Sequence, residues 1–282
     1  MESEIVRRSR SVADLLGADM LSYCGPIDDA AVPFLRQVIE ATPKHRRRLA
    51  VQLETTGGFI ESAERMVNVF RHHYRTVDFL ITSYAMSAGT VLVMSGNDIY
   101  MDYAATLGPI DPQLLRPDNR RFVPALGYLE QFSRLIERSA SGVLTDAELA
   151  YLLRNFDPGE LYQYEQARDL SVALIEDWLA RYKFKDWRVT AGSGTRVTSA
   201  MKRARAKDVA LKLNETQRWH SHNRGISMDV ARRDLKLQII DIDDNAELSD
   251  ALRVYNQLML NYRMARGHHE FIVVWEDGYH GH

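Results

Sequence analysis

The chain has 282 residues, which is long enough for one large α/β domain or for a domain with an appendage. With 45% hydrophobic residues, 26% charged residues and a formal net charge of −2, it resembles neither a disordered nor a fibrous protein. The near-neutral charge argues against a nucleic-acid partner. Cys24 is the single cysteine, so an internal disulfide is impossible, and without a CxxC motif or a Cys/His cluster we expect no structural metal.

The first twenty residues carry basic side chains without the apolar segment of a signal peptide, and no apolar run approaches the roughly 20 residues of a spanning helix. We therefore expect a cytoplasmic protein that does not span a membrane. Basic clusters at 7–10, 44–48 and 202–207 are expected to be solvated loops and helix faces.

Strands and helices alternate through the first hundred residues. Strands are predicted at 20–24, 49–53, 77–82 and 98–101, and helices at 30–41, 60–74 and 88–95. Strands that alternate with helices predict a parallel sheet with right-handed crossovers.

Beyond Pro112 this alternation stops, and we place a boundary between a core at 1–125 and a mainly helical extension at 126–282. Helices are predicted at 126–139, 144–156, 161–183, 199–213 and 248–264, and strands at 235–242 and 271–275.

Two turns rich in small residues follow two consecutive predicted strands, so both are expected at the carboxyl edge of the sheet, where α/β proteins bind ligands. Gly57 and Gly58 would leave backbone N–H groups accessible to a substrate oxygen. Ser87 would begin a helix, where free N–H groups favour a developing oxyanion. A serine that attacks a carbonyl, with the N–H groups of Gly58 and Ala88 holding the oxygen, is typical of acyl transfer; a helix cap is the alternative role for Ser87.

Three motifs occur here in order: LETTGGFIESAERM, YAMSAGT and DIYMDYAATLGPIDPQL. Together they resemble the serine dehydrogenase proteinase branch of the signal peptide peptidase clan, within the Clp/crotonase superfamily. Shorter similarities to that superfamily lie in SYCGPIDDAAV and RWHSHNRGIS. The resemblance implies a Clp/crotonase-like spiral of ββα units, a homo-oligomer, a peptide or protein substrate, and a serine endopeptidase with Ser87 as nucleophile and no cofactor.

The general base is the point at which the sequence departs from its relatives. Gly108 and Pro109 stand where Clp-type enzymes place a histidine, and no lysine occurs between Lys44 and Lys183. The predicted helix 161–183 offers Arg168 and Asp169 instead, and arginine is too basic to act as a base.

Three possibilities stay open for the base. His222, or else His220, could reach Ser87 from the C-terminal region. An amine from Lys183, Lys185, Lys202 or a neighbouring subunit could take its place. Alternatively, Ser87 has no base, and the chain is a non-catalytic oligomeric scaffold or binding protein.

Other candidate residues have weaker patterns. Asp111 could orient a base or bind substrate, although an aspartate before proline is also common in turns. Ser83 is expected in a turn, and the histidine-rich C-terminus lacks metal-ligand spacing. A crotonase-type enzyme acting on acyl-CoA thioesters would use the same paired N–H groups, but would not need the serine.

Overall fold

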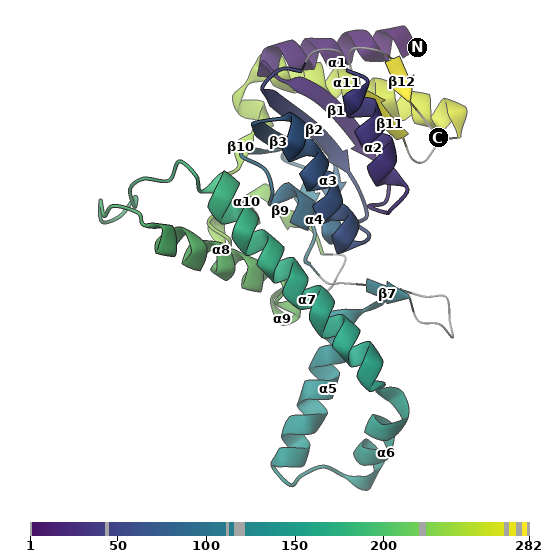
Figure 1. The fold of residues 1–282 in the computed structure, drawn as a ribbon, viewed down its shortest axis with the longest axis vertical. Helices are drawn as coiled ribbons and strands as arrows, with labels where there is room; N and C mark the ends of the chain where they lie inside the picture. The colour runs from purple at the N-terminus through teal and green to yellow at the C-terminus, as the bar shows by residue number, and fades with distance from the viewer. Residues whose placement is uncertain are drawn as a thin grey trace.

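A twisted sheet of mostly parallel strands lies at the centre of the protein (Figure 1). The structure is a computed structural model that describes residues 2–42, 45–110, 113–115, 122–219, 224–267, 271–274 and 278–280. In these ranges seven strands pair in the order β10-β5-β3-β2-β1-β11-β12. Their bounds are β1 (Asp19–Cys24), β2 (Arg48–Glu54), β3 (Thr76–Ile81), β5 (Ile99–Met101), β10 (Ile240–Asp241), β11 (Phe271–Val274) and β12 (Gly278–His280). The first five of these run parallel, and β11 and β12 add an antiparallel edge beside β1.

Helices cover both faces of the sheet, which explains why its central strands are mostly buried. Helices α2 (Ala31–Glu40) and α3 (Ile60–His73) lie on one face, and α1 (Glu2–Leu16) and α11 (Ala246–Arg266) lie together on the other (Figure 1). All six residues of β1 are buried as a result. Just before α2, the Asp28 carboxylate accepts the Ala31 N–H at 2.9 Å.

A second, small sheet extends beyond the carboxyl ends of β2 and β3. Strand β4 (Tyr84–Ala85) pairs in parallel with β6 (Thr106–Leu107), which pairs in antiparallel with β9 (Ile226–Ser227). Helix α4 (Ala88–Val93) follows β4 after two residues. This small sheet therefore joins three segments that are distant in sequence. Ser87 lies two residues beyond the end of its edge strand, β4.

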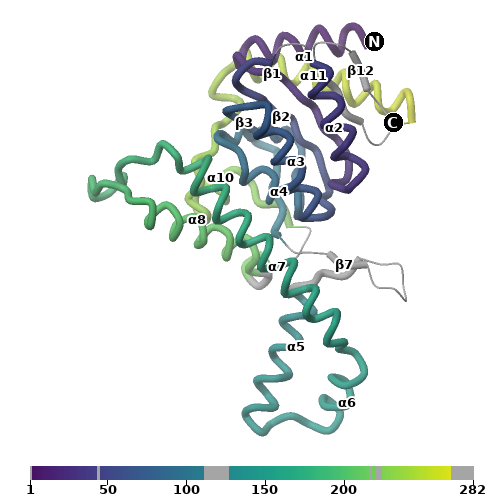
Figure 2. Tube along the Cα trace, viewed as in Figure 1, coloured from purple at the N-terminus to yellow at the C-terminus, as the bar shows by residue number. Residues whose placement is uncertain are grey.

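The middle of the chain forms a helical arm that extends from the body (Figure 2). It contains the hairpin β7 (Gln113–Leu115) and β8 (Phe122–Pro124), then α5 (Ala125–Ala140), α6 (Asp146–Asn155) and the long α7 (Pro158–Trp178). A separate small apolar cluster around Leu129, Leu161 and Tyr164 packs the arm. The other end of α7 packs against the core, through contacts with α3 and α4.

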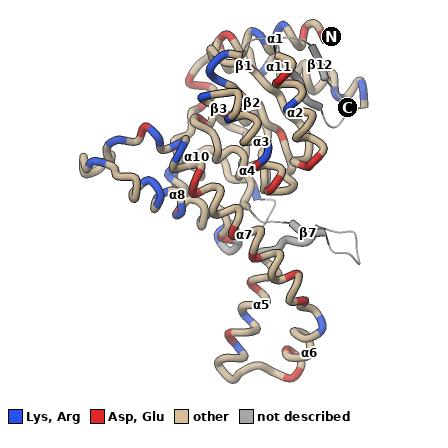
Figure 3. The backbone as a smooth tube through the Cα atoms, viewed as in Figure 1, with Lys and Arg blue, Asp and Glu red and all other residues tan. Residues whose placement is uncertain are grey.

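The rest of the extension returns to the body. After a π-helical turn η1 (Leu179–Lys183) and an exposed loop come α8 (Ser199–Leu213), α9 (Thr216–Trp219), α10 (Met228–Arg233) and the 3-10 turn η2 (Ile242–Asp244). Helix α8 packs along α7, and Lys and Arg positions are spread along the loop and α8 (Figure 3). No helix in the described ranges is both long and apolar enough to cross a bilayer.

The α/β class with a parallel sheet is confirmed, while some element predictions are wrong. The strand predicted at 235–242 is real only at Ile240–Asp241: Leu235, Leu237 and Ile239 are buried alternately, but they do not pair with another strand. Helix α1 was not predicted. The two-part division at residue 125 stays a prediction, although β10, α11 and β11 complete the sheet that the first part begins.

Candidate active site

Ser87 lies in a sharp backbone turn between β4 and α4. Its φ of 50° and ψ of −116° belong to a region that side-chain-bearing residues rarely adopt. Such a conformation costs on the order of 1–3 kcal/mol, and it persists only where the surroundings hold it. The residue as a whole is 6% exposed. A serine held in this strained turn differs from an ordinary helix cap, and its side chain makes no cap hydrogen bond to α4.

Two glycines leave the space in which this turn fits. A Cβ on Gly57 would lie 2.8 Å from the Met86 carbonyl oxygen and 2.9 Å from Ser87 Cβ. A Cβ on Gly108 would lie 3.0 Å from the Ser87 nitrogen. Both loops thus approach Ser87 so closely that no side chain fits, which places the predicted Gly57 turn beside the predicted nucleophile.

Backbone hydrogen bonds join the two turns that the sequence placed at the same edge. The Thr55 N–H donates to the Tyr84 carbonyl at 3.1 Å, and the Met86 N–H donates to the Thr55 carbonyl at 2.9 Å. On the other side, the Gly108 N–H lies 3.0 Å from the Ala85 carbonyl oxygen. The segment before Ser87 is therefore held from both sides.

The N–H groups of Gly58 and Ala88 are candidates for binding a substrate oxygen. The loop beside Gly58 is anchored by the Ile27 N–H, which donates to the Gly57 carbonyl at 2.8 Å, and by the Phe59 N–H, which donates to the Ile27 carbonyl at 2.8 Å. Among the described residues, neither the Gly58 nor the Ala88 N–H donates a backbone hydrogen bond. Gly58 has a φ of 151° and no room for a Cβ, which would lie 2.1 Å from the Ile27 oxygen.

Two further residues, neither of them predicted as a site residue from the sequence, support the turn. The buried Thr90 hydroxyl lies 2.7 Å from the Ala85 carbonyl oxygen and 2.8 Å from that of Gly108. Thr90 and Gly108 belong to the motifs that carried the resemblance, AMSAGT and LGP, so the signal was present in the sequence. What the sequence could not show is that the two motifs meet.

Lys183 does not lie beside Ser87, which corrects one of the possibilities for the base. Its ammonium pairs with Asp98 at 3.4 Å, just before β5, and burial lowers its pKa. Asp98 lies level with Asp78 near the amino end of β3, whereas Ser87 follows the carboxyl end of that strand. Lys183 and Ser87 thus lie at opposite ends of the strands.

Lys185 and Lys202 lie on the loop and at the start of α8, where the Lys202 ammonium donates to the Lys185 carbonyl. The end of α8 that approaches the site is Leu213, whose carbonyl accepts the Ile110 N–H at 3.0 Å. Eleven residues of helix, about 16 Å, separate Lys202 from that end. Neither amine is therefore in position to act on Ser87 of the same chain.

The remaining predicted residues divide into two groups. Asp111, His220 and His222, with the C-terminal histidine pair His268 and His269, lie outside the described residues. The Ser83 carbonyl accepts the Thr106 N–H at 2.9 Å, in keeping with the predicted turn role. The described part of the chain contains no group of three His, Cys, Asp or Glu residues that could hold a metal ion.

The first part of the chain matches a known protein family. Residues 4–129 match the family of ClpP-like SDH-type serine proteinases. This match confirms the resemblance that the three motifs indicated, and at the level of the family it supports a peptidase. It spans the Gly57 turn, Ser87 and Gly108.

Two curated relatives come from Methanocaldococcus jannaschii. Uncharacterized protein MJ0137 is 33% identical over 78 residues, which are 28% of this chain and 27% of the relative. Uncharacterized protein MJ1495 is 26% identical over 150 residues, or 51% of this chain and 48% of the relative. The matched parts thus span less than half the length of either relative.

Solved structures of membrane-bound stomatin-specific protease 1510-N are also similar. One, a serine-to-alanine mutant, is 11% identical, with a TM-score of 0.43 over 78% of this chain and 76% of that one. Another, a lysine-to-alanine mutant in complex with a substrate peptide, is 11% identical, with a TM-score of 0.44 over 78% and 72% of the two chains.

Proposed function

We propose that the protein is a serine peptidase that cleaves peptide bonds through an acyl-enzyme on Ser87. The observation that carries this proposal is the strained Ser87 turn, which is held against two glycine loops. A fold does not retain such strain for a simple cap, because an unstrained serine caps a helix equally well. The match of residues 4–129 to a serine proteinase family supports the same role.

The reaction would proceed in two steps. Ser87 Oγ attacks the carbonyl carbon while its proton passes to a general base, and the π electrons of the carbonyl move onto the oxygen. The N–H groups of Gly58 and Ala88 stabilise that oxyanion. Collapse breaks the C–N bond as the base returns the proton to the leaving amine, and water then hydrolyses the ester by the same route.

His222 is the proposed base. Strand β9 begins at Ile226, four residues after His222, and Ile226 pairs with Leu107, the neighbour of Gly108. This pairing of β9 beside Gly108 is the observation that supports His222 as the candidate. An imidazole is suited to accepting a serine proton near neutral pH.

The substrate is proposed to be an unfolded or membrane-derived peptide, and the working form a homo-oligomer. Support for assembly comes from the arm, where Leu149, Tyr151 and Leu153 are 44%, 52% and 72% exposed. Apolar side chains gathered on a projecting element are typical of an interface. Sedimentation velocity of the protein and of Leu153→Glu tests this: a monomeric wild-type protein at micromolar concentration would contradict it.

Labelling with a fluorophosphonate probe tests the catalytic role of Ser87. We expect one covalent adduct, located on Ser87 by mass spectrometry of peptides, and none in Ser87→Ala. Ser141→Ala is the matched control, because Ser141 is an exposed serine at the end of α5 on the arm and should leave labelling unchanged. If Ser87 stays unlabelled across pH 5–9 in the assembled state, the chain is instead the non-catalytic scaffold.

The base is tested by the pH profile of the same labelling. His222→Ala should slow labelling near neutral pH by about 10²- to 10⁴-fold, the usual contribution of a general base. His220→Ala should label at the wild-type rate. Equal loss in both variants, or loss only in His220→Ala, would remove His222 from this role.

A further inference from the structure

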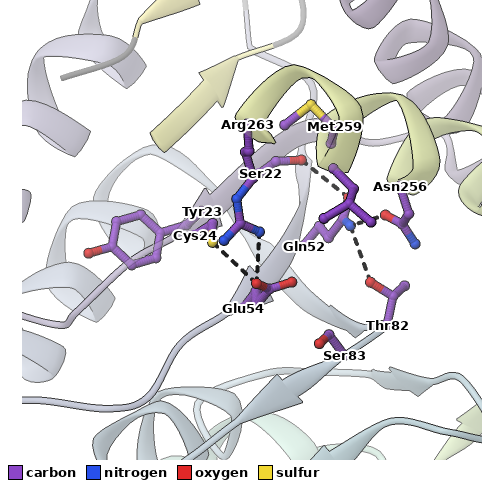
Figure 4. Close-up of a pocket in the computed structure, with 11 residues that line it drawn as sticks. Ser22, Tyr23, Cys24, Gln52, Glu54, Thr82, Ser83, Asn256, Met259 and Arg263 are labelled. Carbon is purple, nitrogen blue, oxygen red and sulfur yellow. Dashed lines mark hydrogen bonds and ion pairs between the residues drawn. The ribbon is translucent and has the colours of Figure 1, made fainter. Parts of the chain in front are cut away.

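A pocket with both polar and apolar lining lies between helix α11 and the carboxyl ends of β1, β2 and β3, on the face of the sheet that α11 covers (Figure 4). Its volume is about 350 Å³, within the range of small-ligand sites. Its polar lining comes from four segments distant in sequence: Ser22 and Cys24, Gln52 and Glu54, Thr82 and Ser83, and Asn256 and Arg263. The carboxyl ends of parallel strands are where α/β folds bind ligands.

One set of hydrogen bonds holds the wall of the pocket in place. The Gln52 amide nitrogen donates to the Thr82 hydroxyl at 3.2 Å and to the Asn256 side-chain oxygen. The Gln52 oxygen accepts the Ser22 hydroxyl at 3.3 Å (Figure 4). Both amide hydrogens of Gln52 and one lone pair of its oxygen are thus used in organising its neighbours, so the wall is formed before any ligand binds.

The charges in the pocket compensate each other. Arg263 of α11 pairs with Glu54 Oε1 at 2.8 Å, and the Cys24 thiol lies 3.4 Å from the same oxygen (Figure 4). A ligand with a net charge would have no uncompensated partner here, and burying it would carry a desolvation cost. The pocket therefore favours an uncharged ligand.

Four groups remain available to such a ligand. The Asn256 oxygen is taken by Gln52, but no described residue accepts a hydrogen bond from its amide nitrogen. Within the described ranges, the Ser83 hydroxyl likewise donates to no residue. No described residue donates a hydrogen bond to Glu54 Oε2. The Thr82 hydroxyl accepts from Gln52 but donates to no described residue, so the free set is three donor groups and one strong acceptor, beside apolar atoms of Met259 and Leu260.

We propose that this pocket binds an uncharged amide ligand, a short stretch of peptide main chain, whose carbonyl accepts from Asn256 and Ser83 and whose N–H donates to Glu54. A peptide unit has one carbonyl with two lone pairs, which can accept from two of these donors, and one N–H, which can donate to the carboxylate. The site does not require Ser87 to be a nucleophile. It lies on the side of the strands that α11 covers, and it uses no residue of the Ser87 turn between β4 and α4.

Saturation-transfer NMR with N-acetylalaninamide, on the Ser87→Ala protein to exclude turnover, tests the proposal. The neutral amide should bind, and acetate and ethylammonium should bind at least about tenfold more weakly. Asn256→Ala and Ser83→Ala should each weaken binding by roughly five- to tenfold, the value of one hydrogen bond. Gln257→Ala, an exposed neighbour on the same helix, should leave binding unchanged.

Cys24 supplies a second measurement. It is the single cysteine of the chain and lines the pocket, so its rate of modification by a small thiosulfonate reports on this site alone. Saturating N-acetylalaninamide should slow the modification severalfold in the protein and not in Asn256→Ala. Absence of saturation transfer, equal affinity in the pocket variants, or tighter binding of either charged probe would overturn the proposal, whatever the outcome of Ser87 labelling.

Discussion

Thr90 and Gly108 form a two-way contact: the Gly108 N–H donates to the Thr90 hydroxyl at 2.9 Å, and that hydroxyl lies 2.8 Å from the Gly108 carbonyl oxygen. Because the hydroxyl has a single hydrogen, it donates either to Gly108 or to the Ala85 carbonyl at 2.7 Å. One buried side chain on α4 therefore ties together the strand before Ser87 and the loop that lies against it. The shape of the candidate site depends on this contact.

Replacing Thr90 by valine keeps the shape of the side chain and removes its hydroxyl. Buried backbone groups of Gly108 and Ala85 would lose a partner, so we expect the free energy of unfolding to fall by about 1–3 kcal/mol. Fluorophosphonate labelling of Ser87 should slow by on the order of 10²-fold, because the turn loses its support. Urea denaturation and labelling rates measure the two effects. Thr90→Ser, which retains the hydroxyl, should label much faster than Thr90→Val; equal rates would contradict the positioning role.

A methyl group at Gly57 should abolish labelling. It would lie 2.9 Å from Ser87 Cβ on a backbone with a φ of 102°, so the loop must move away from the nucleophile. Circular dichroism should show that Gly57→Ala keeps its helix content. Gly192→Ala is the matched control, since a Cβ there meets nothing within 4 Å. Normal labelling of Gly57→Ala would show that the loop does not need to approach Ser87 this closely.

Lys183→Met should leave Ser87 labelling unchanged, because this lysine lies at the opposite edge of the sheet. Its ammonium is buried, with a side chain 4% exposed, whereas the side chain of Asp98 is 45% exposed. Removing the lysine leaves a solvated carboxylate, so stability should stay the same or rise.

Asp98→Ala instead leaves a buried ammonium without this partner, and we expect the free energy of unfolding to fall by about 1–2 kcal/mol after allowing for solvent screening. Urea denaturation distinguishes the two; a loss of labelling in Lys183→Met would return Lys183 to the list of bases.

Stability should fall at alkaline pH through Tyr255. Burial raises the pKa of this phenol from 10.0 to about 12, and its hydroxyl lies 2.8 Å from that of Ser22. The unfolded chain releases the proton near pH 10 while the folded chain keeps it, so the contribution is present below pH 10 and is lost as pH rises to 12. The loss amounts to roughly 2–3 kcal/mol.

Thermal unfolding between pH 9 and 12 measures this effect. Tyr255→Phe should show a flatter decline, and Tyr162→Phe, whose side chain is 63% exposed, should follow the wild-type curve. Identical curves for all three proteins would contradict the assignment to Tyr255.

Local patterns in the sequence determined most of the fold. The elements of the parallel core were predictable because apolar runs, helical periodicity and glycine turns are signals within about ten residues. Helix α8 was predicted at 199–213, and those are its bounds in the structure. Helix α1 was missed because only Ile5, Ser9, Val12 and Ala13 are buried in it, a weak stripe among charged residues.

For the candidate site, the sequence alone determined that Ser87 and two glycines are present, and that no lysine occurs between Lys44 and Lys183. Only the tertiary structure decided that Ser87 occupies a strained turn, that Gly108 and Thr90 brace it, and that Lys183 is held at the far edge of the sheet. The pocket under α11 was likewise invisible, since its lining comes from segments up to about 240 residues apart. The physical reason is that backbone strain, close approach and charge pairing are set by contacts between distant segments, and these leave no local pattern.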